Sequence, residues 1–510
     1  MVTWGDESAY LTLGYLAASG KISLFQDEMR GQRLPLPFYV LGASQLLWGR
    51  GLLPARLLSL VFGSIAVVCV AIIARRLKGD TAGLLAALFL ASQGVMAGFF
   101  AAAVYHGLAA AILMGGLALI LCVRSPAGPV AGMAVVSLLF LIRGSLWPVL
   151  PAILVALLVQ AKSRLERGLL VAAAGAVPAA FFLSDVRHLK VLAYVPLVNR
   201  LVESLGYRAV FPLIGHRSQE SSQQLLGVLR LVRMYEYWAL AAALLVAAIC
   251  IRRWRGRDVR PFFDDRRTIS LTLLLAFIFL AQLPVYGDRF RELAGLFPSF
   301  APLLPLLLGI GYVTLLEQKE WSAPGWRLFA IGGLTAILVA PLMIVRHPLL
   351  PSGADAGATP LADLDRAARH LHELIPPGTK VFLYGYAIPL YLADRVPYYR
   401  QIHDPNSLAS VEDHPRIQRN GLWGLAEMEA WLGTDAEYAV IMPVVVTALR
   451  PTRPVPIARM EALLAQHFER IARVDEYRWW VCDVYRRRAA STARGAPGSP
   501  TPLAPPAPAT

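Results

Sequence analysis

Two adjacent carboxylates, Asp6 and Glu7, are the first side chains in this sequence that could carry out acid–base chemistry. A carboxylate within hydrogen-bond reach of a hydroxyl takes its proton while the oxygen attacks an electrophilic carbon. His106 is a further candidate, because imidazole titrates near neutral pH. We therefore predict a catalytic group of Asp6, Glu7 and His106. The alternative is a solvated acidic pair, in which Glu7 orients its neighbour or caps a helix, together with a histidine that only completes a turn.

Four arginines are candidates for binding an anion on the same side of a membrane as these residues, namely Arg33, Arg143, Arg289 and Arg291. Guanidinium groups bind phosphate through charge-assisted hydrogen bonds. We predict that they hold a charged headgroup whose tail lies in lipid. The alternatives are that Arg33 extends to lipid headgroups, that Arg289 and Arg291 anchor the chain at the membrane surface, and that Arg143 is a helix-end charge.

The composition places these residues in a membrane protein. Of 510 residues, 56% are hydrophobic and 16% are charged, and the mean hydropathy is +0.52. A soluble domain is nearer ~25% charged. The net charge of +15 comes from basic residues beside apolar runs, where they set topology, so it does not indicate nucleic-acid binding. The four cysteines form neither a disulfide framework nor a CxxC metal site.

The apolar runs predict ten transmembrane helices, since a span needs ~20 residues. Eight runs are long enough alone, and two shorter ones need flanking residues. They are Leu57 to Ala74, Ala82 to Phe100, Gly107 to Val123, Leu146 to Gln160, Gly168 to Ser184, Ile269 to Tyr286, Leu293 to Leu316 and Leu328 to Val345, with the shorter Pro129 to Ile142 and Trp238 to Ile251.

Basic clusters at alternate connections predict the orientation of these helices, because such clusters stay in the cytoplasm. One cluster follows the first span at Arg75, Arg76 and Lys78, and the largest begins at Arg252. The other side, which is predicted to be outside, holds the first outer loop (1–56), the turns at His106 and Arg143, the loops 185–237 and 287–292, and everything after 346.

The outer C-terminal part is predicted to fold as a small α/β domain. Apolar residues recur at helical spacing from Leu361 to Ile375, and strand-like runs follow at Lys380 to Tyr384, Tyr438 to Met442 and Trp479 to Tyr485. An amphipathic helix is predicted from Ile457 to Ile471. The predicted organisation is a transmembrane domain (1–350), an extracytoplasmic α/β domain (351–488) and a disordered tail (489–510).

The stretch from Gln32 to Gly49 is apolar but short, with prolines at its start and a tryptophan at its end. This composition predicts a helix that lies at the membrane interface instead of crossing it. Such helices commonly frame a site at membrane level.

Taken in order, these motifs resemble the polytopic GT-C glycosyltransferases, in the branch of protein O-mannosyltransferases and lipid A aminoarabinose transferases. Four segments show the resemblance. Asp6 to Tyr10 matches the acidic motif of the first loop, and Arg33 to Tyr39 matches the Lys-Pro-Pro-Leu-x-Tyr signature. Pro54 to Leu57 matches the start of the next span, and Leu141 to Gly144 resembles a later turn. The resemblance covers about the first 150 residues by motif and the rest by layout.

The resemblance implies a polyprenyl-phosphate-linked sugar as donor, an acceptor hydroxyl on a lipid, glycan or protein, and inverting transfer at the outer face of the cell (inner or plasma) membrane. Asp6 would be the general base, and Arg33, Arg289 and Arg291 would stabilise the leaving phosphate. The resemblance is equally compatible with transfer of a hexosyl group and of a pentosyl group. Family layout also implies an eleventh helix before Asp6, so we expect about 10 to 11 transmembrane helices and an upstream apolar segment.

The sequence departs from the family at Gln32, where aminoarabinose transferases have a glutamate, and at Leu34, which replaces the first proline of the signature. It also departs at the turn from Val104 to Gly107, where many members carry an aspartate. A divalent cation is therefore not assigned, and the cofactor stays unknown. Two other classes of protein remain open. A transporter or flippase of a lipid-linked saccharide would share the scale of the fold, although the spans carry almost no ionisable residues near their midpoints. A non-catalytic envelope assembly protein would depend on its C-terminal domain instead.

Overall fold

A computed structural model describes most of the helical region and the C-terminal part of the chain. The described residues are 5–24, 34–185, 188–189, 191–192, 204, 235–262, 269–277, 297–318, 361–398, 401–402, 407–409, 415, 417, 422–477 and 480–489. Arg33, Arg289, Arg291, the predicted span from Leu328 to Val345, most of the loop 185–237 and the predicted tail lie outside them.

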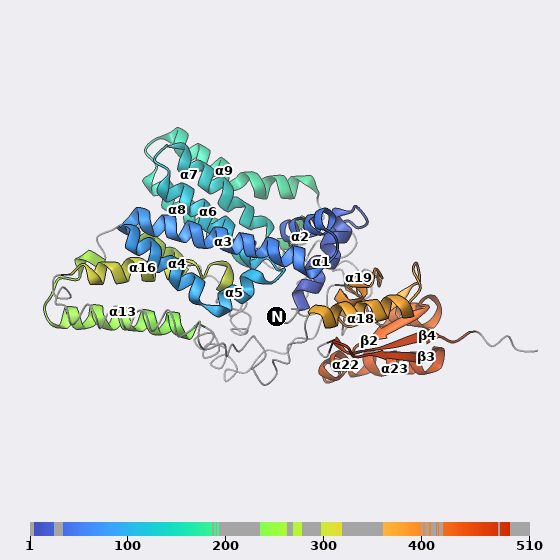
Figure 1. Cartoon of the computed structure of the whole chain (residues 1–510). Helices are drawn as coiled ribbons and strands as arrows, with labels where there is room; N and C mark the ends of the chain where they lie inside the picture. Colours follow the sequence, from blue (N-terminus) through green and yellow to red (C-terminus); the bar gives the residue numbers. More distant parts are fainter. Residues whose placement is uncertain are drawn as a thin grey trace, which may run out of the picture.

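The described part of the chain up to residue 318 is almost entirely helical (Figure 1). The helices are α1 Gly5–Ala18, α2 Pro35–Trp48, α3 Leu52–Lys78, α4 Asp80–Ser92, α5 Gly94–Ala101, α6 His106–Cys122, α7 Ala127–Ser137, η2 Leu138–Leu141, η3 Gly144–Leu146, α8 Val149–Gln160, α9 Arg164–Ser184, α13 Glu236–Trp254, η5 Arg260–Phe262, η6 Phe297–Ser299 and α16 Leu303–Leu316.

Within the described ranges, α3, α9 and α13 are each long and apolar enough to cross a bilayer, and α4 with α5 would form a fourth span bent by 72°. Four shorter apolar helices accompany them. The chain is therefore a membrane protein, while the expected number of spans stays a prediction.

The predicted span from Ala82 to Phe100 is present as two helices, because α4 ends at Ser92 and α5 starts at Gly94. At the end of α4 the Phe89 carbonyl accepts only a long hydrogen bond of 3.4 Å from the Ser92 hydroxyl of the same helix. The indole Nε1 of Trp238, a residue of α13 that is almost fully buried, donates to that oxygen at 2.8 Å. The break is thus stabilised by a helix that lies far away in sequence.

Two short helices precede the first long one and pack directly against each other (Figure 1). The stretch from Gln32 to Gly49 contains helix α2, with its prolines in the first turn. The α1 helix, which the sequence analysis did not predict, contacts α2 at Gly14 and Gly42. A Cβ atom on Gly42 would lie 2.0 Å from the Gly14 carbonyl oxygen, so only glycine permits this approach.

The C-terminal α/β region (361–489) contains a four-stranded sheet in the order β1-β2-β4-β3. Strand β1 (Val381–Tyr384) is parallel to β2 (Tyr438–Ile441), whereas β4 (Cys482–Arg487) is antiparallel to β2 and to β3 (Phe468–Val474). The helices are α18 Leu361–Leu374, α19 Ile388–Leu392, α21 Leu425–Ala430, the π-helical turn η10 Trp431–Asp435, α22 Pro443–Leu449 and α23 Pro454–His467.

The predicted helix from Ile457 to Ile471 is wrong at both ends. It begins earlier, at Pro454, and it stops at His467, where the chain turns into β3. The reason is pairing, because Phe468 lies opposite Arg487 of β4 and Val474 lies opposite Cys482. The other predicted helix and strands of this region are present with boundaries shifted by one to three residues.

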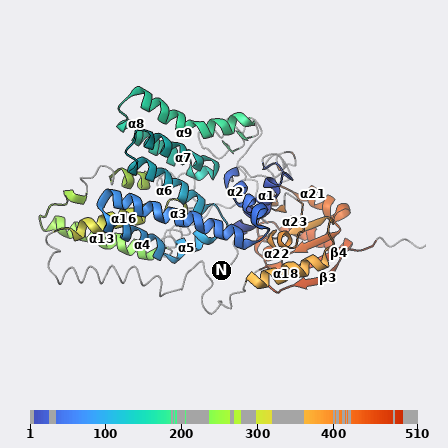
Figure 2. The same cartoon turned by 45° about the horizontal axis from the view of Figure 1, so that its top comes forward.

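Figures 1 and 2 both place α1 and α2 between the long helices and the C-terminal α/β region. Helix α1 contacts α2 on one side and α19 on another. The first outer segment therefore joins the two parts of the molecule.

Candidate functional site

The two acidic residues at the start of α1 have opposite environments. The Asp6 side chain is exposed, whereas Glu7 is 0% exposed. Because neighbouring residues on a helix point about 100° apart, one of them faces outward when the other enters the core. Asp6 is thus the acid that an incoming molecule can reach.

Glu7 is held by a buried arginine. Arg56, near the start of α3, donates from Nε to Oε1 at 2.9 Å and from Nη2 to Oε2 at 2.8 Å. The backbone N–H of Ala103 adds a third hydrogen bond to Oε1 at 2.7 Å. A bidentate pair fixes direction as well as distance, so the start of α1 is locked against α3 and the turn before α6.

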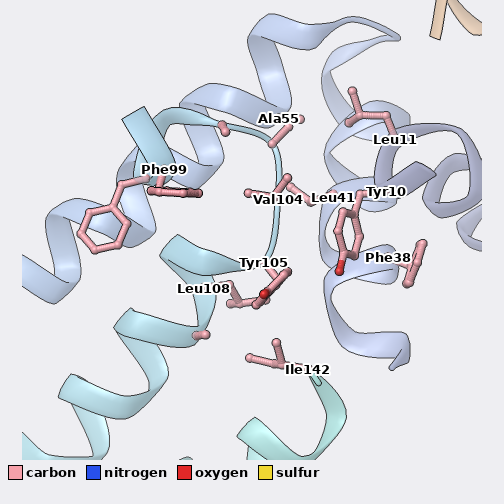
Figure 3. Close-up of a cluster of buried hydrophobic side chains, with 14 of the residues drawn as sticks. Tyr10, Leu11, Phe38, Leu41, Ala55, Phe99, Val104, Tyr105, Leu108 and Ile142 are labelled. Atoms are coloured by element: carbon pink, nitrogen blue, oxygen red, sulfur yellow. The ribbon is translucent and has the colours of Figure 1, made fainter. Parts of the chain in front are cut away.

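A row of aromatic side chains continues from α1 to the turn before α6. Tyr10 packs on Phe38 of α2 with ring centroids 4.7 Å apart, and on Tyr105 at 6.1 Å. Figure 3 shows Tyr10 between these two rings, with Ile142 close to Tyr105. The row covers the apolar side of the turn that supplies the Ala103 amide to Glu7.

Arg143 lies beside this row. Its Nη1 donates to the Tyr105 hydroxyl at 3.1 Å, and its guanidinium carbon is 5.2 Å from the centre of the Tyr105 ring. The side chain remains partly exposed. Arg143 is thus positioned by an aromatic partner while part of its charge remains accessible.

His106 is buried behind the same turn. Its ring lies 4.9 Å from that of Phe99 and 4.1 Å from that of Tyr105, and Nδ1 is 3.1 Å from the Ser299 hydroxyl in η6. His106 is 6% exposed, so it lies inside the protein and not on the surface that presents Asp6. Its contact with Ser299 links α6 to the segment that follows the 287–292 loop.

A pocket of about 420 Å³ opens beside Leu141, two residues before Arg143 in the sequence. Its walls come from Ser23 and Leu24 after α1, from the first turns of α2, from Leu141, and from the last turns of α9 with the residues that follow. The lining residues are Ser23, Leu24, Pro35, Tyr39, Leu141, Val177, Ala180, Phe181, Ser184, Asp185 and His188. Most of this wall is apolar, with polar groups at Ser184, Asp185 and His188, as in pockets that bind amphiphilic molecules.

The structure thus brings Glu7, His106 and Arg143 around the turn from Ala103 to His106, with Asp6 next to Glu7. Arg33, Arg289 and Arg291 are outside the described residues, and their roles stay predictions. Arg56 and Tyr105 are not predicted as site residues from the sequence. Arg56 is nevertheless part of the Pro-Ala-Arg-Leu motif that marks the start of a predicted span. Within the described ranges, no group of three or more His, Cys, Asp or Glu side chains could hold a metal ion.

Comparison with known proteins gives matches in structure alone. No protein-family model and no curated protein sequence matches the chain. The structure of ArnT from Cupriavidus metallidurans bound to undecaprenyl phosphate has a TM-score of 0.56 at 16% identity, covering 96% of this chain and 94% of that one. Its apo structure gives 0.56 at 14% identity, covering 95% and 93%.

The apo oligosaccharyltransferase of Archaeoglobus fulgidus has a TM-score of 0.51 at 13% identity, covering 91% of this chain and 69% of that one. This chain therefore shares the fold of ArnT and of this oligosaccharyltransferase, so the resemblance predicted from the sequence is confirmed at the level of the fold.

Proposed function

We propose that this protein is an integral membrane glycosyltransferase that moves a sugar from a polyprenyl-phosphate donor to an acceptor hydroxyl on the extracytoplasmic face. The observation that carries the proposal is the pair at the start of α1, in which Asp6 is exposed and Glu7 is buried against Arg56. The shared fold of ArnT, one of whose structures holds undecaprenyl phosphate, supports the choice of donor.

In the proposed reaction Asp6 accepts the proton of the acceptor hydroxyl while its oxygen forms a bond to the anomeric carbon. The bond between that carbon and the phosphate oxygen breaks, its electron pair leaves with the polyprenyl phosphate, and the anomeric configuration inverts. Glu7 is an unsuitable base because three donors already occupy its carboxylate. We assign Glu7 and Arg56 as positioning residues for Asp6.

The leaving phosphate gains negative charge, which fixed guanidinium groups stabilise without reorganising. Arg143 is the described candidate, and we retain Arg33, Arg289 and Arg291 in the same role. The nearby pocket of about 420 Å³ would take only the part of the donor close to its phosphate, because pockets of this size hold drug-sized ligands. His106, buried against Ser299, is assigned to supporting Tyr105 and not to transferring a proton.

The test is transfer from a radiolabelled polyprenyl-phosphate sugar in membranes that contain the protein. Asp6→Asn keeps size and hydrogen bonding but removes the base, so the maximal rate should fall by about 10²-fold or more. Arg143→Ala should instead weaken apparent donor affinity, by roughly 10-fold for the loss of a charge-assisted hydrogen bond.

The matched control is Asp80→Asn, which changes an exposed aspartate in the first turn of α4 on the predicted cytoplasmic side. Its transfer rate should equal that of the wild type. Normal transfer by a folded Asp6→Asn protein would remove Asp6 from the reaction and favour the transporter or assembly functions.

The orientation can be tested without any substrate. A cysteine introduced at Asp365 should react with a membrane-impermeant thiol reagent in sealed cells, and one at Arg255 should not. Labelling at Arg255 from outside would reverse the topology on which the outward-facing site depends.

A further inference from the structure

Besides its packing on α2 at Gly14 and Gly42, helix α1 is fixed by polar side-chain contacts at two places, and the second lies in the C-terminal α/β region. The first is the contact of Glu7 with Arg56. The second surrounds Tyr15, whose hydroxyl accepts a hydrogen bond of 2.9 Å from Arg50 Nη2 and whose ring lies 4.3 Å from the guanidinium carbon. The Tyr391 ring of α19 packs against the Tyr15 ring at 5.8 Å and 61°.

The same arginine reaches the C-terminal region directly, because Arg50 Nη1 donates to a carboxylate oxygen of Asp394. Beside it, the Tyr391 hydroxyl donates to Gln45 Oε1 at 3.1 Å. That oxygen also accepts the Gly51 backbone N–H at 2.8 Å, at the turn between α2 and α3. These five side chains, Tyr15, Gln45, Arg50, Tyr391 and Asp394, form what we call the α19 contact.

The α19 contact is built on a rigid loop. Asp394 has a φ of 57°, in the left-handed region that non-glycine residues seldom adopt. The next residue, Arg395, is 4% exposed and donates to the carbonyls of Ile375, His372, Ala393 and Asp394. A loop held by a buried guanidinium keeps the Asp394 carboxylate in place before Arg50 meets it.

From this geometry we propose that the α19 contact positions the catalytic helix, so that Tyr391, Asp394 and Arg50 act through α1 on Asp6. The proposal rests on the glycosyl transfer proposed above. With Glu7 and the packing on α2 alone, α1 and α2 could still tilt together about the start of α1. A second fixed point near Tyr15 removes that freedom and sets the direction in which Asp6 points at the acceptor.

A positioning role differs in its kinetics from simple attachment of a domain. The α19 contact touches no donor atom, so its loss should lower kcat and leave the donor KM within about twofold. Because a shift of about 1 Å in a reacting group costs up to 10²-fold in rate, we expect a decrease in kcat on the order of 10-fold.

The main variant is Asp394→Asn, because asparagine tolerates the left-handed conformation while removing the charge that pairs with Arg50. Tyr391→Phe removes the bond to Gln45 and keeps the ring. The control is Glu461→Gln, which breaks the exposed pair with Arg450 elsewhere in the same region. Asp394→Asn and Tyr391→Phe should lower kcat, whereas the control should not.

A second measurement does not depend on catalysis. Amide hydrogen exchange of the peptide covering α1 should be faster in Asp394→Asn than in the wild type or in Glu461→Gln, because one of its two fixed points is weakened. In an Arg50→Met background, Asp394→Asn should have no further effect on kcat or on exchange, since both changes break the same link.

The outcomes separate the two proposals. If the wild type transfers sugar, Asp6→Asn does not, and Asp394→Asn matches the wild type in both kcat and exchange, the positioning role is wrong and the glycosyl transfer stands. If the wild type transfers nothing while exchange of α1 still depends on Asp394, the proposed function is wrong and the α19 contact stands only as a structural link.

Discussion

The buried pair of Glu7 and Arg56 makes a prediction in which two substitutions should be less harmful than either one. The side chains are 0% and 7% exposed, so removing one of them takes from the other buried charge the opposite charge of this ion pair. Such a loss typically costs about 3–5 kcal/mol. Arg56→Met should therefore destabilise the protein by about that amount.

Glu7→Leu should cost more than Arg56→Met. It removes the carboxylate that pairs with the buried Arg56 charge, at about 3–5 kcal/mol, and it also removes the acceptor of the Ala103 amide, at about 1–3 kcal/mol. In the double variant Glu7→Leu/Arg56→Met no buried charge remains, and only the stranded amide is left. The double variant should therefore be more stable than the Glu7→Leu protein, with a loss of about 1–3 kcal/mol.

The assay is thermal unfolding in detergent, followed by a near-UV signal for the four proteins in parallel. The transfer assay on the same samples then tests the positioning role separately. The double variant regains stability but still lacks the Glu7–Arg56 hydrogen bonds that fix the direction of α1. We expect its transfer rate to stay low. Additive losses in the double variant would refute the interpretation of the pair as a coupled buried unit.

Three further predictions concern single sites. Gly42→Ala should destabilise the protein strongly and lower transfer, because its Cβ would meet the Gly14 carbonyl oxygen at 2.0 Å, whereas Gly115→Ala meets nothing within 4 Å and should be neutral by thermal unfolding. Tyr384→Phe should raise the unfolding free energy by up to about 1 kcal/mol, because its buried hydroxyl has no partner among the described residues. Burial, followed by the neighbouring carboxylates, raises the pKa of Cys482 to about 12, so this thiol should resist alkylation in the folded protein at pH 9. Because the unfolded thiol ionises near pH 8.5, stability should fall as the pH rises above that value.

The sequence was sufficient for features that depend on contiguous or regularly spaced residues. Helix α3 follows from an uncharged run bounded by the arginines at 75 and 76, and α18 follows from its apolar spacing. The acidic pair was singled out because adjacent acids ahead of an apolar bundle are unusual. Which of the two enters the core was not predictable, because that depends on Arg56 and Ala103, at 49 and 96 residues from Glu7.

Other features depend on a partner that the local sequence does not contain. The segment Phe468–Val474 has apolar residues that fit a helix as well as a strand, and pairing with β4 decides in favour of the strand. The break between α4 and α5 is similar, because an indole from α13 takes the Phe89 carbonyl. Helix α1 is not predicted from the sequence, because its residues do not form an uninterrupted apolar run and because Asp6 and Glu7 lie in its first turn.

The contact between Arg50 and Asp394 also orders events during synthesis, since it joins residues separated by 344 positions. At roughly 5–20 residues per second, a ribosome needs about 20 to 70 seconds to add that length of chain. Throughout this time the nascent protein has the Glu7–Arg56 pair but not the second fixed point of α1. A partly made chain can therefore insert its first spans before the direction of Asp6 is set, so assembly of the active form would wait until α19 and the loop that carries Asp394 have left the ribosome.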